Sequence, residues 1–216
     1  MAGVILIGVI MTFIVSKMLS ATILKGMPSS FVLELPPYRK PQVGRVILHS
    51  VFDRTLFVLG RAAAVAAPVG LILWFMANII VGDQTVLIHC ADFLDPLGKL
   101  MGMDGAILLG FILGFPANEI VMPIVMMIYL CQGNLTQIGN IHVLGQLLVD
   151  NGWTWVTAVC MIVFSLMHWP CGTTCLTVRK ETGSLAWTAA AIFIPTAIGF
   201  LLCFIISGAA SLFHWV

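Results

Sequence analysis

The sequence predicts an all-α integral membrane protein with about five transmembrane helices, two of them discontinuous, and an amphipathic helix at the membrane interface. Hydrophobic residues make up 60% of the 216 residues and charged residues only 9%, whereas soluble domains are about 25% charged. The mean hydropathy is +1.08, and several apolar runs reach the roughly 20 residues that a helix needs to cross a bilayer. Lipid is therefore the main solvent of this chain, and its net charge of +1 gives no indication of nucleic-acid binding.

Charged residues are distributed unevenly, which predicts how the chain is oriented. Residues 82–104 contain four aspartates and a single lysine, Lys99. The N-terminal part instead collects basic residues before residue 62: Lys17, Lys25, Arg39, Lys40, Arg45, Arg54 and Arg61. Because cytoplasmic loops are enriched in Lys and Arg, we expect residues 25–61 in the cytoplasm and residues 82–104 to form a loop on the outer side of the membrane.

Residues 1–61 are expected to contain a first span, a connector and an interfacial helix. The apolar run 2–24 predicts the span, with Lys17 near its end. Four prolines between residues 28 and 41 predict a rigid connector, because proline fixes φ and has no amide donor. Between residues 42 and 60, apolar and charged residues alternate at near-helical spacing, which is typical of a helix in the headgroup plane.

The later apolar runs define two further regions. Residues 62–131 are expected to form a membrane domain with a span at 62–81 and an apolar run at 106–131. Residues 132–216 form the C-terminal membrane region, with apolar runs at 154–168 and 185–213. The last run contains a proline and exceeds the usual length of a span, so we expect it to be kinked or tilted.

The number of crossings depends on the interruption at Pro116. If each run crosses once, the chain makes five crossings, with the N terminus outside and the C terminus inside. This arrangement places Arg179 and Lys180 on the outer face, against the charge rule. If the chain instead turns back at Pro116 in a re-entrant hairpin, these two residues return to the cytoplasm and the number of crossings falls. We prefer five crossings.

Two interruptions in the apolar runs share one pattern. Each has an apolar half-helix, an aromatic-proline pair, small or polar residues and a second helical segment, and Pro116 and Pro170 lie 54 residues apart. Paired broken helices are typical of transporter binding sites. Carbonyls freed by such a break can coordinate a cation, although prolines also kink membrane helices that have no transport role.

Glu119 is the one acidic residue inside an expected span, beside Asn118. A charge at the bilayer centre costs about 2.5 to 3.5 kcal/mol on insertion scales, so something must compensate it. One hypothesis is that Glu119 binds a cation together with Asn118 and freed carbonyls. The structural alternative is that Glu119 caps the second half-helix, whose N terminus favours a carboxylate.

His168, Cys171 and Cys175 follow one another at steps of three and four residues. They would share one side of a helix if Pro170 left the geometry nearly helical, and would then bring an imidazole and two thiols together. These groups are metal ligands, although by affinity they favour copper or zinc over ferrous iron. The alternative is that the cysteines are only buried packing residues.

At these positions the chain resembles FeoB, the bacterial family of ferrous-iron transporters. The matching stretches are Phe31–Arg39, Gly114–Val121 and Trp169–Glu181. The resemblance implies that Fe²⁺ is the transported ion, that residues 62–131 belong to a Gate-type domain and that Cys171 is the gate cysteine of the ion path. It also implies that Arg179, Lys180 and Glu181 form the end of that gate.

The same resemblance implies a partner. The family couples its membrane region to a cytoplasmic GTPase, and no G-x-x-x-x-G-K-[ST] phosphate loop occurs in these residues. We therefore expect no enzymatic activity and no permanently bound cofactor here, with the GTPase-bearing N-terminal half on another chain. The chain would be a split subunit, a truncated product or a decayed gene, in a bacterial inner membrane and in contact with lipid or with further copies of itself.

Two other functions fit the same residues. Cys171 and Cys175 could serve a membrane thiol oxidoreductase, although no cofactor motif accompanies them. The chain could also be an assembly or interaction subunit that transports nothing.

Overall fold

The computed structural model describes residues 2–22, 44, 52, 55–133, 135 and 139–212. It divides into two units, residues 1–54 and 55–216. The described part of the first unit is essentially one helix, α1 (Ala2–Thr22), whose large apolar side chains are exposed, as with Phe13 and Ile5. An apolar surface of this kind suits contact with lipid. The expected interfacial helix at 42–60 lies mostly outside the described residues.

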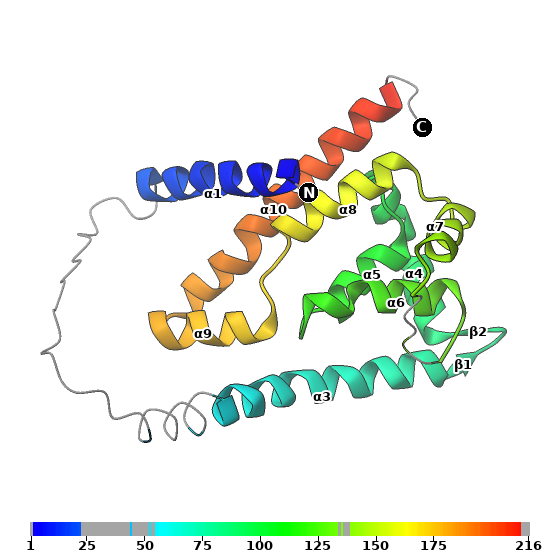
Figure 1. Ribbon diagram of the computed structural model, residues 1–216, viewed down its shortest axis with the longest axis horizontal. Helices are drawn as coiled ribbons and strands as arrows, with labels where there is room; N and C mark the ends of the chain where they lie inside the picture. Colours follow the sequence, from blue (N-terminus) through cyan, green and yellow to red (C-terminus); the bar gives the residue numbers. More distant parts are fainter. Residues whose placement is uncertain are drawn as a thin grey trace, which may run out of the picture. The chain divides into compact units, whose positions relative to one another are not determined.

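The second unit begins with a long apolar helix and a short hairpin (Figure 1). Helix α3 (Phe57–Asn78) contains Pro68 and is followed by strands β1 (Ile80–Val81) and β2 (Gln84–Thr85), which pair antiparallel. The turn between the strands is Gly82-Asp83, with Gly82 at a φ of 70°. Glycine adopts this left-handed conformation without the steric penalty of a Cβ.

Residues 82–104 were expected to form a loop, and this expectation is wrong in part. Helix α4 (Val86–Leu100) occupies most of that segment, and Thr85 caps it by accepting a hydrogen bond from the amide of Ile88. Helix α5 (Gly105–Leu113) follows at 110° to α4, with Asp104 as its cap. A Cβ at Gly105 would lie 1.9 Å from the carbonyl oxygen of Ala91, so the two helices need glycine to approach this closely.

The apolar run 106–131 is not one continuous crossing. A 3₁₀ turn, η2 (Asn118–Ile120), separates α5 from α6 (Val121–Tyr129), and a Cβ at Gly110 of α5 would lie 2.9 Å from Val125 of α6. The chain therefore turns back at this interruption. Nine residues make a helix of about 14 Å, less than half of a hydrocarbon core of about 30 Å. This geometry favours the re-entrant alternative over a simple crossing.

The C-terminal part contains four helices. Helix α7 (Ile141–Asp150) is short and has no buried residue, whereas α8 (Trp155–Met167) begins with a capping box made by Thr154 and Thr157. Helix α9 (Gly172–Thr182) and helix α10 (Leu185–Leu212), which contains Pro195, complete the fold. The strongest packing between helices outside the α4–α6 group joins α8 to α10.

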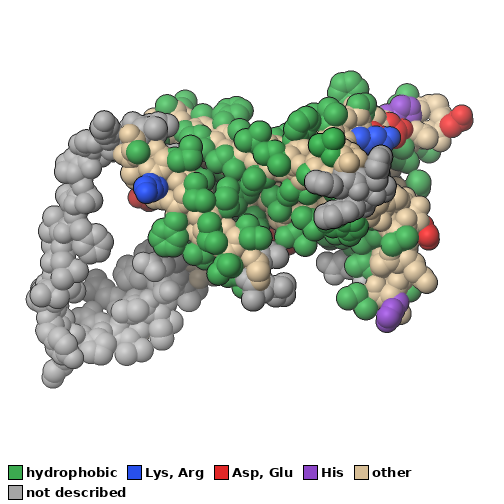
Figure 2. Space-filling view, turned by 90° about the horizontal axis from the view of Figure 1, so that it is seen from above, with side chains coloured by type: hydrophobic (Ala, Val, Ile, Leu, Met, Phe, Trp, Pro, Cys, Tyr) green, Lys and Arg blue, Asp and Glu red, His purple; other side chains and the backbone are tan. Residues whose placement is uncertain are grey.

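Three described helical segments are long and apolar enough to cross a membrane: Val58–Asn78, Trp155–Thr182 and Leu185–Leu212. A fourth counts only if the bent pair α4 and α5 is one span. The described residues therefore give three or four spans where five were expected. Figure 2 shows hydrophobic side chains over most of the visible described surface, with few charged ones, as expected for a multi-pass membrane protein.

Candidate functional site

The first interruption separates α5 from α6. Helix α5 ends at Leu113, Ala117 has extended backbone, and η2 then leads into α6. Pro116 is buried, whereas Asn118 and Glu119 are exposed. Neither η2 nor α6 has a side-chain hydrogen bond at its N-cap. Glu119 nevertheless lies in the first turn of η2, directly before α6, where a helix N terminus favours a carboxylate, so the structural alternative for Glu119 also stays a prediction.

The second interruption separates α8 from α9. Helix α8 ends at Met167, and both His168 (ψ 175°) and Cys171 (ψ 156°) have non-helical, extended backbone. Pro170 has no amide to continue the helix. The condition under which His168, Cys171 and Cys175 would share one helix face is therefore not met, because the helix does not continue through Pro170.

The two interruptions meet. The amide of Gly172, at the start of α9, donates a hydrogen bond of 2.8 Å to the carbonyl oxygen of Phe115. A Cβ at Gly172 would lie 2.8 Å from Cγ1 of Val65 on α3 and 3.0 Å from Cε1 of Phe115. Figure 1 shows the turn that leads from α5 into α6 beside the segment that joins α8 to α9. Three segments that are far apart in the sequence therefore converge on a position where only glycine fits.

His168 lies in an aromatic cluster next to this junction. It is 8% exposed, and its ring centroid lies 5.0 Å from that of Phe111 and 6.1 Å from that of Phe164. Its Nδ1 lies 2.9 Å from the carbonyl oxygen of Ser165 and 3.2 Å from that of Phe164. Two acceptors at Nδ1 require the proton to be there, so the neutral ring carries its lone pair on Nε2. Within the described residues this buried Nε2 has no hydrogen-bond partner.

The two thiols of the second interruption have different partners. The half-buried Cys171 lies 3.2 Å and 3.1 Å from the hydroxyls of Thr173 and Thr174, whereas the buried Cys175 donates to the carbonyl oxygen of Pro170 at 3.4 Å. No group of three or more His, Cys, Asp or Glu side chains positioned to hold a metal ion occurs among the described residues. The expected ligand set of Cys171, Glu119, Asn118, His168 and Cys175 stays a prediction.

The expected end of the gate is the last turn of α9. Arg179, Lys180 and Glu181 are exposed there, and Gly183 ends the helix at a φ of 63° by donating to the carbonyl oxygen of Arg179. Basic side chains are favourable at this end of a helix, where carbonyls are left without intrahelical partners. Their gating role stays a prediction.

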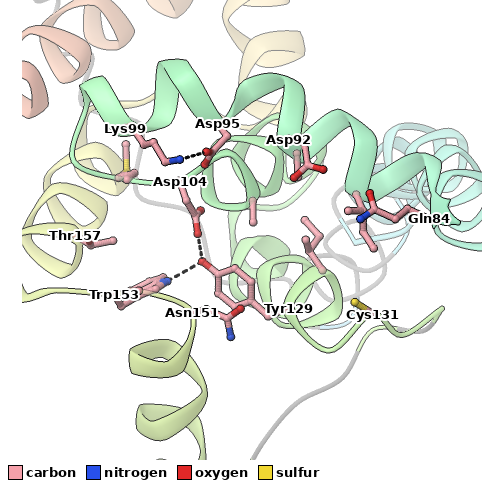
Figure 3. Close-up of a pocket in the computed structure, with 16 residues that line it drawn as sticks. Gln84, Asp92, Asp95, Lys99, Asp104, Tyr129, Cys131, Asn151, Trp153 and Thr157 are labelled. Carbon is pink, nitrogen blue, oxygen red and sulfur yellow. Dashed lines mark hydrogen bonds and ion pairs between the residues drawn. The ribbon is translucent and has the colours of Figure 1, made fainter.

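A separate polar pocket of about 550 Å³ lies between α4, α5, α6 and the segment before α8 (Figure 3). Its polar lining includes Asp92, Asp95, Lys99, Asp104, Tyr129 and Trp153. Lys99 pairs with Asp95 at 2.5 Å. The indole of Trp153 donates to the Tyr129 hydroxyl at 2.7 Å, and that hydroxyl donates to Asp104. Burial, together with the adjacent Asp104 carboxylate, raises the pKa of Tyr129, so its hydroxyl keeps its proton.

Comparisons with known proteins identify the family. Residues 46–185 match the Gate model, described as nucleoside recognition, and residues 1–53 match the model of the C terminus of ferrous iron transport protein B. The chain belongs to the Gate family, as the C-terminal membrane region of FeoB. Both helix interruptions lie inside the Gate match. The expected boundaries at residues 61 and 131 stay predictions.

Curated relatives named Fe(2+) transporter FeoB align with most of this chain. The protein of Staphylococcus aureus (strain COL) is 28% identical over 96% of the chain, that of Leptospira interrogans (strain Fiocruz L1-130) 25% over 95%, and that of Synechocystis sp. 27% over 86%. The chain spans 31%, 32% and 29% of these FeoB proteins, respectively. No solved structure matches it.

Several residues of this candidate site were not predicted from the sequence. Phe111 and Phe115 looked like ordinary apolar residues, and Val65 lies in a distant helix. Gly172 had a signal, because glycine often marks a position of close backbone approach, and Gly172 lies two residues after Pro170. Tyr129 and Trp153 gave no signal, since only the fold brings them to Asp104.

Proposed function

We propose that this chain forms the membrane part of a path by which Fe²⁺ crosses a bacterial inner membrane, and that the ion passes the junction of the two helix interruptions. The observation that carries this proposal is the hydrogen bond from Gly172 to Phe115, which joins the two breaks. Broken helices are tolerated at membrane depth where they are buried or line a cavity. The FeoB relatives are named as Fe²⁺ transporters, which supplies the identity of the cargo.

Side chains at the junction would have distinct roles. The exposed carboxylate of Glu119, with the amide of Asn118, would attract a divalent cation. Cys171 would provide a ligand that becomes a thiolate when metal is bound. His168 would offer the lone pair of Nε2, and Cys175 would support the turn through its contact with the carbonyl of Pro170. Pro116 and Pro170 would keep both helices interrupted at these positions, because proline has no amide to continue a helix.

Gating would involve a partner. Arg179, Lys180 and Glu181 lie together on the exposed last turn of α9, the helix that begins at the junction. A GTPase-bearing part of the transporter, acting on this end of α9, would move the second interruption relative to the first.

The thiol oxidoreductase alternative is less favoured by the geometry. A catalytic dithiol needs an accessible thiolate with a resolving thiol beside it. Here Cys175 is buried and donates to a backbone carbonyl, whereas Cys171 interacts with two threonine hydroxyls.

His168→Phe tests the proposal against a purely structural role. Phenylalanine keeps an aromatic ring against Phe111 and Phe164 but removes Nε2. It also removes the Nδ1–H donor to the carbonyl oxygens of Ser165 and Phe164, which costs about 1 to 3 kcal/mol of stability, so uptake is compared at equal protein level. We expect loss of Fe²⁺ uptake in anaerobic cells that contain the complete transporter. His142→Phe, on the exposed surface of α7, is the control and should transport normally. Normal uptake by His168→Phe would exclude His168 from the path.

A further inference from the structure

Two cysteines outside the helix interruptions face each other across a helix interface. Cys160 on α8 and Cys203 on α10 are both 0% exposed and free. The Cys203 thiol donates to the carbonyl oxygen of Cys160 at 3.4 Å, and the Cys160 thiol lies 4.0 Å from the carbonyl oxygen of Cys203. Each Cβ–Sγ bond therefore points at the partner residue.

This reciprocal arrangement places the two cysteine residues next to each other, which is the first requirement for a disulfide. A disulfide forms when the Cβ atoms lie about 3.5 to 4.5 Å apart and their Cβ–Sγ bonds point toward each other. The backbones also lie close along this interface, because a Cβ at Gly199 of α10 would be 3.1 Å from Cβ of Met167 and 3.2 Å from Cδ2 of Phe164.

We propose that Cys160 and Cys203 are a redox modification site, at which a reversible disulfide formed in the presence of dioxygen fixes α8 to α10. The part of this inference that concerns transport rests on the proposed function. In the reaction two S–H bonds break and one S–S bond forms. The two electrons and two protons pass to dioxygen, which becomes hydrogen peroxide, and a dithiol reductant returns both thiols.

The apolar surroundings of the two thiols favour a small, uncharged oxidant. Both thiols are closed off from solvent inside an apolar core that includes Phe164 and Met103, so a charged oxidant would have to leave water to reach them. Dioxygen is small and apolar and dissolves in the bilayer. It also oxidises free ferrous iron, so the disulfide would form under the conditions in which the transported ion disappears.

The position of the pair explains how it would act on transport. Cys160 lies seven residues before Met167, the last residue of α8, which is about 10 Å along the helix. The second interruption follows directly after Met167. A covalent link at Cys160 would hold α8 on α10 and oppose movement of His168 and Cys171.

Cross-linking tests whether the disulfide forms. Membranes of cells that produce the full chain are treated with dioxygen, and peptides are mapped by mass spectrometry without reduction. We expect a peptide pair joined through Cys160 and Cys203. Cys203→Ala should lack this pair, whereas Cys131→Ala, which changes an exposed cysteine elsewhere, should keep it. Absence of the pair from membranes in which Cys131 has been oxidised would overturn the proposal.

Uptake tests the effect on transport. After the oxidant has been removed, anaerobic Fe²⁺ uptake should be about tenfold lower and should return after dithiothreitol, whereas oxidation should leave Cys203→Ala unaffected. Unchanged uptake by the cross-linked protein would overturn the effect on transport. If the reduced protein takes up no Fe²⁺, the proposed function fails instead, and the peptide map still decides whether the disulfide forms.

Discussion

The two helix interruptions look alike in sequence but differ in structure. At Pro116 the chain turns back, so α5 and α6 pack against each other, and the polar side chains Asn118 and Glu119 point outward. At Pro170 the chain runs extended between α8 and α9. Of the groups there that could bind a metal, His168 is buried and Cys171 is half-buried. The first break therefore offers a backbone acceptor and a carboxylate, and the second offers soft ligands.

This difference indicates a division of roles. A hairpin of two short helices held by glycine contacts is a rigid platform. An extended linker between two helices has fewer internal hydrogen bonds and can shift with less loss of packing. We infer that the second break moves during transport against the first, which stays in place. The hydrogen bond from Gly172 to Phe115 is where they touch.

Gly172→Ala should have the largest effect, because the new Cβ would lie 2.8 Å from Val65 and 3.0 Å from Phe115. Such overpacking costs about 1 to 3 kcal/mol and would push the two breaks apart. We expect Fe²⁺ uptake to fall below detection and the melting temperature in detergent to fall. Gly208→Ala on α10, where nothing lies within 4 Å of the new atom, should change neither. Equal behaviour of the two variants would mean that the contact has no role.

Cys171→Ser should have the next largest effect. Serine keeps the size and the hydrogen bonds to Thr173 and Thr174 but is a much poorer soft ligand. Fe²⁺ uptake measured anaerobically at equal protein level should fall about tenfold. Cys203→Ser, in the α8–α10 interface, serves as the control and should keep most of its uptake. A Cys171→Ser variant that transports normally would leave Cys171 as a packing residue.

Glu119→Gln should have a smaller effect, because the side chain is exposed and an exposed charge attracts a cation only weakly. We expect uptake to fall about fivefold at low ionic strength, with a smaller difference at high salt. The measurement is initial uptake rate against salt concentration, with Asp150→Asn at the end of α7 as the control. A salt-independent defect would point to a structural role for Glu119.

Tyr129→Phe should have the smallest effect on uptake, since the polar pocket lies apart from the helix breaks. It removes the donor to Asp104 and should lower stability by about 1 kcal/mol. Because the pKa of Tyr129 is raised in the folded chain, the wild type should lose stability as the pH rises past the unfolded value of about 10. The melting temperature is measured below and above that pH. It should fall less with rising pH in Tyr129→Phe than in the wild type. The same slope in both proteins would contradict this.

Composition and proline placement were enough to predict a helical membrane protein and the positions of both breaks. The breaks were visible because proline removes a backbone donor wherever it occurs. The helix at 86–100 was missed because its aspartates and lysine looked like a solvated loop. In the structure these charges pair with each other or line one pocket, as Asp95 and Lys99 show.

The contacts within the site were less predictable. Helical spacing placed His168, Cys171 and Cys175 together only if the helix continued through Pro170, and it does not. Conversely, nothing local connects Phe115 to Gly172, which are 57 residues apart and meet only through tertiary packing. The facing pair of Cys160 and Cys203 likewise depends on how α8 packs on α10.

The central claim is that the cation passes the junction of the two breaks, and protection of Cys171 tests it most directly. Anaerobic membranes that contain the complete transporter are treated with a small alkylating reagent, with and without Fe²⁺, and each cysteine is quantified by mass spectrometry. We predict that Fe²⁺ slows alkylation of Cys171 and leaves the exposed Cys131 unchanged. Equal rates at Cys171 with and without Fe²⁺ would contradict the account.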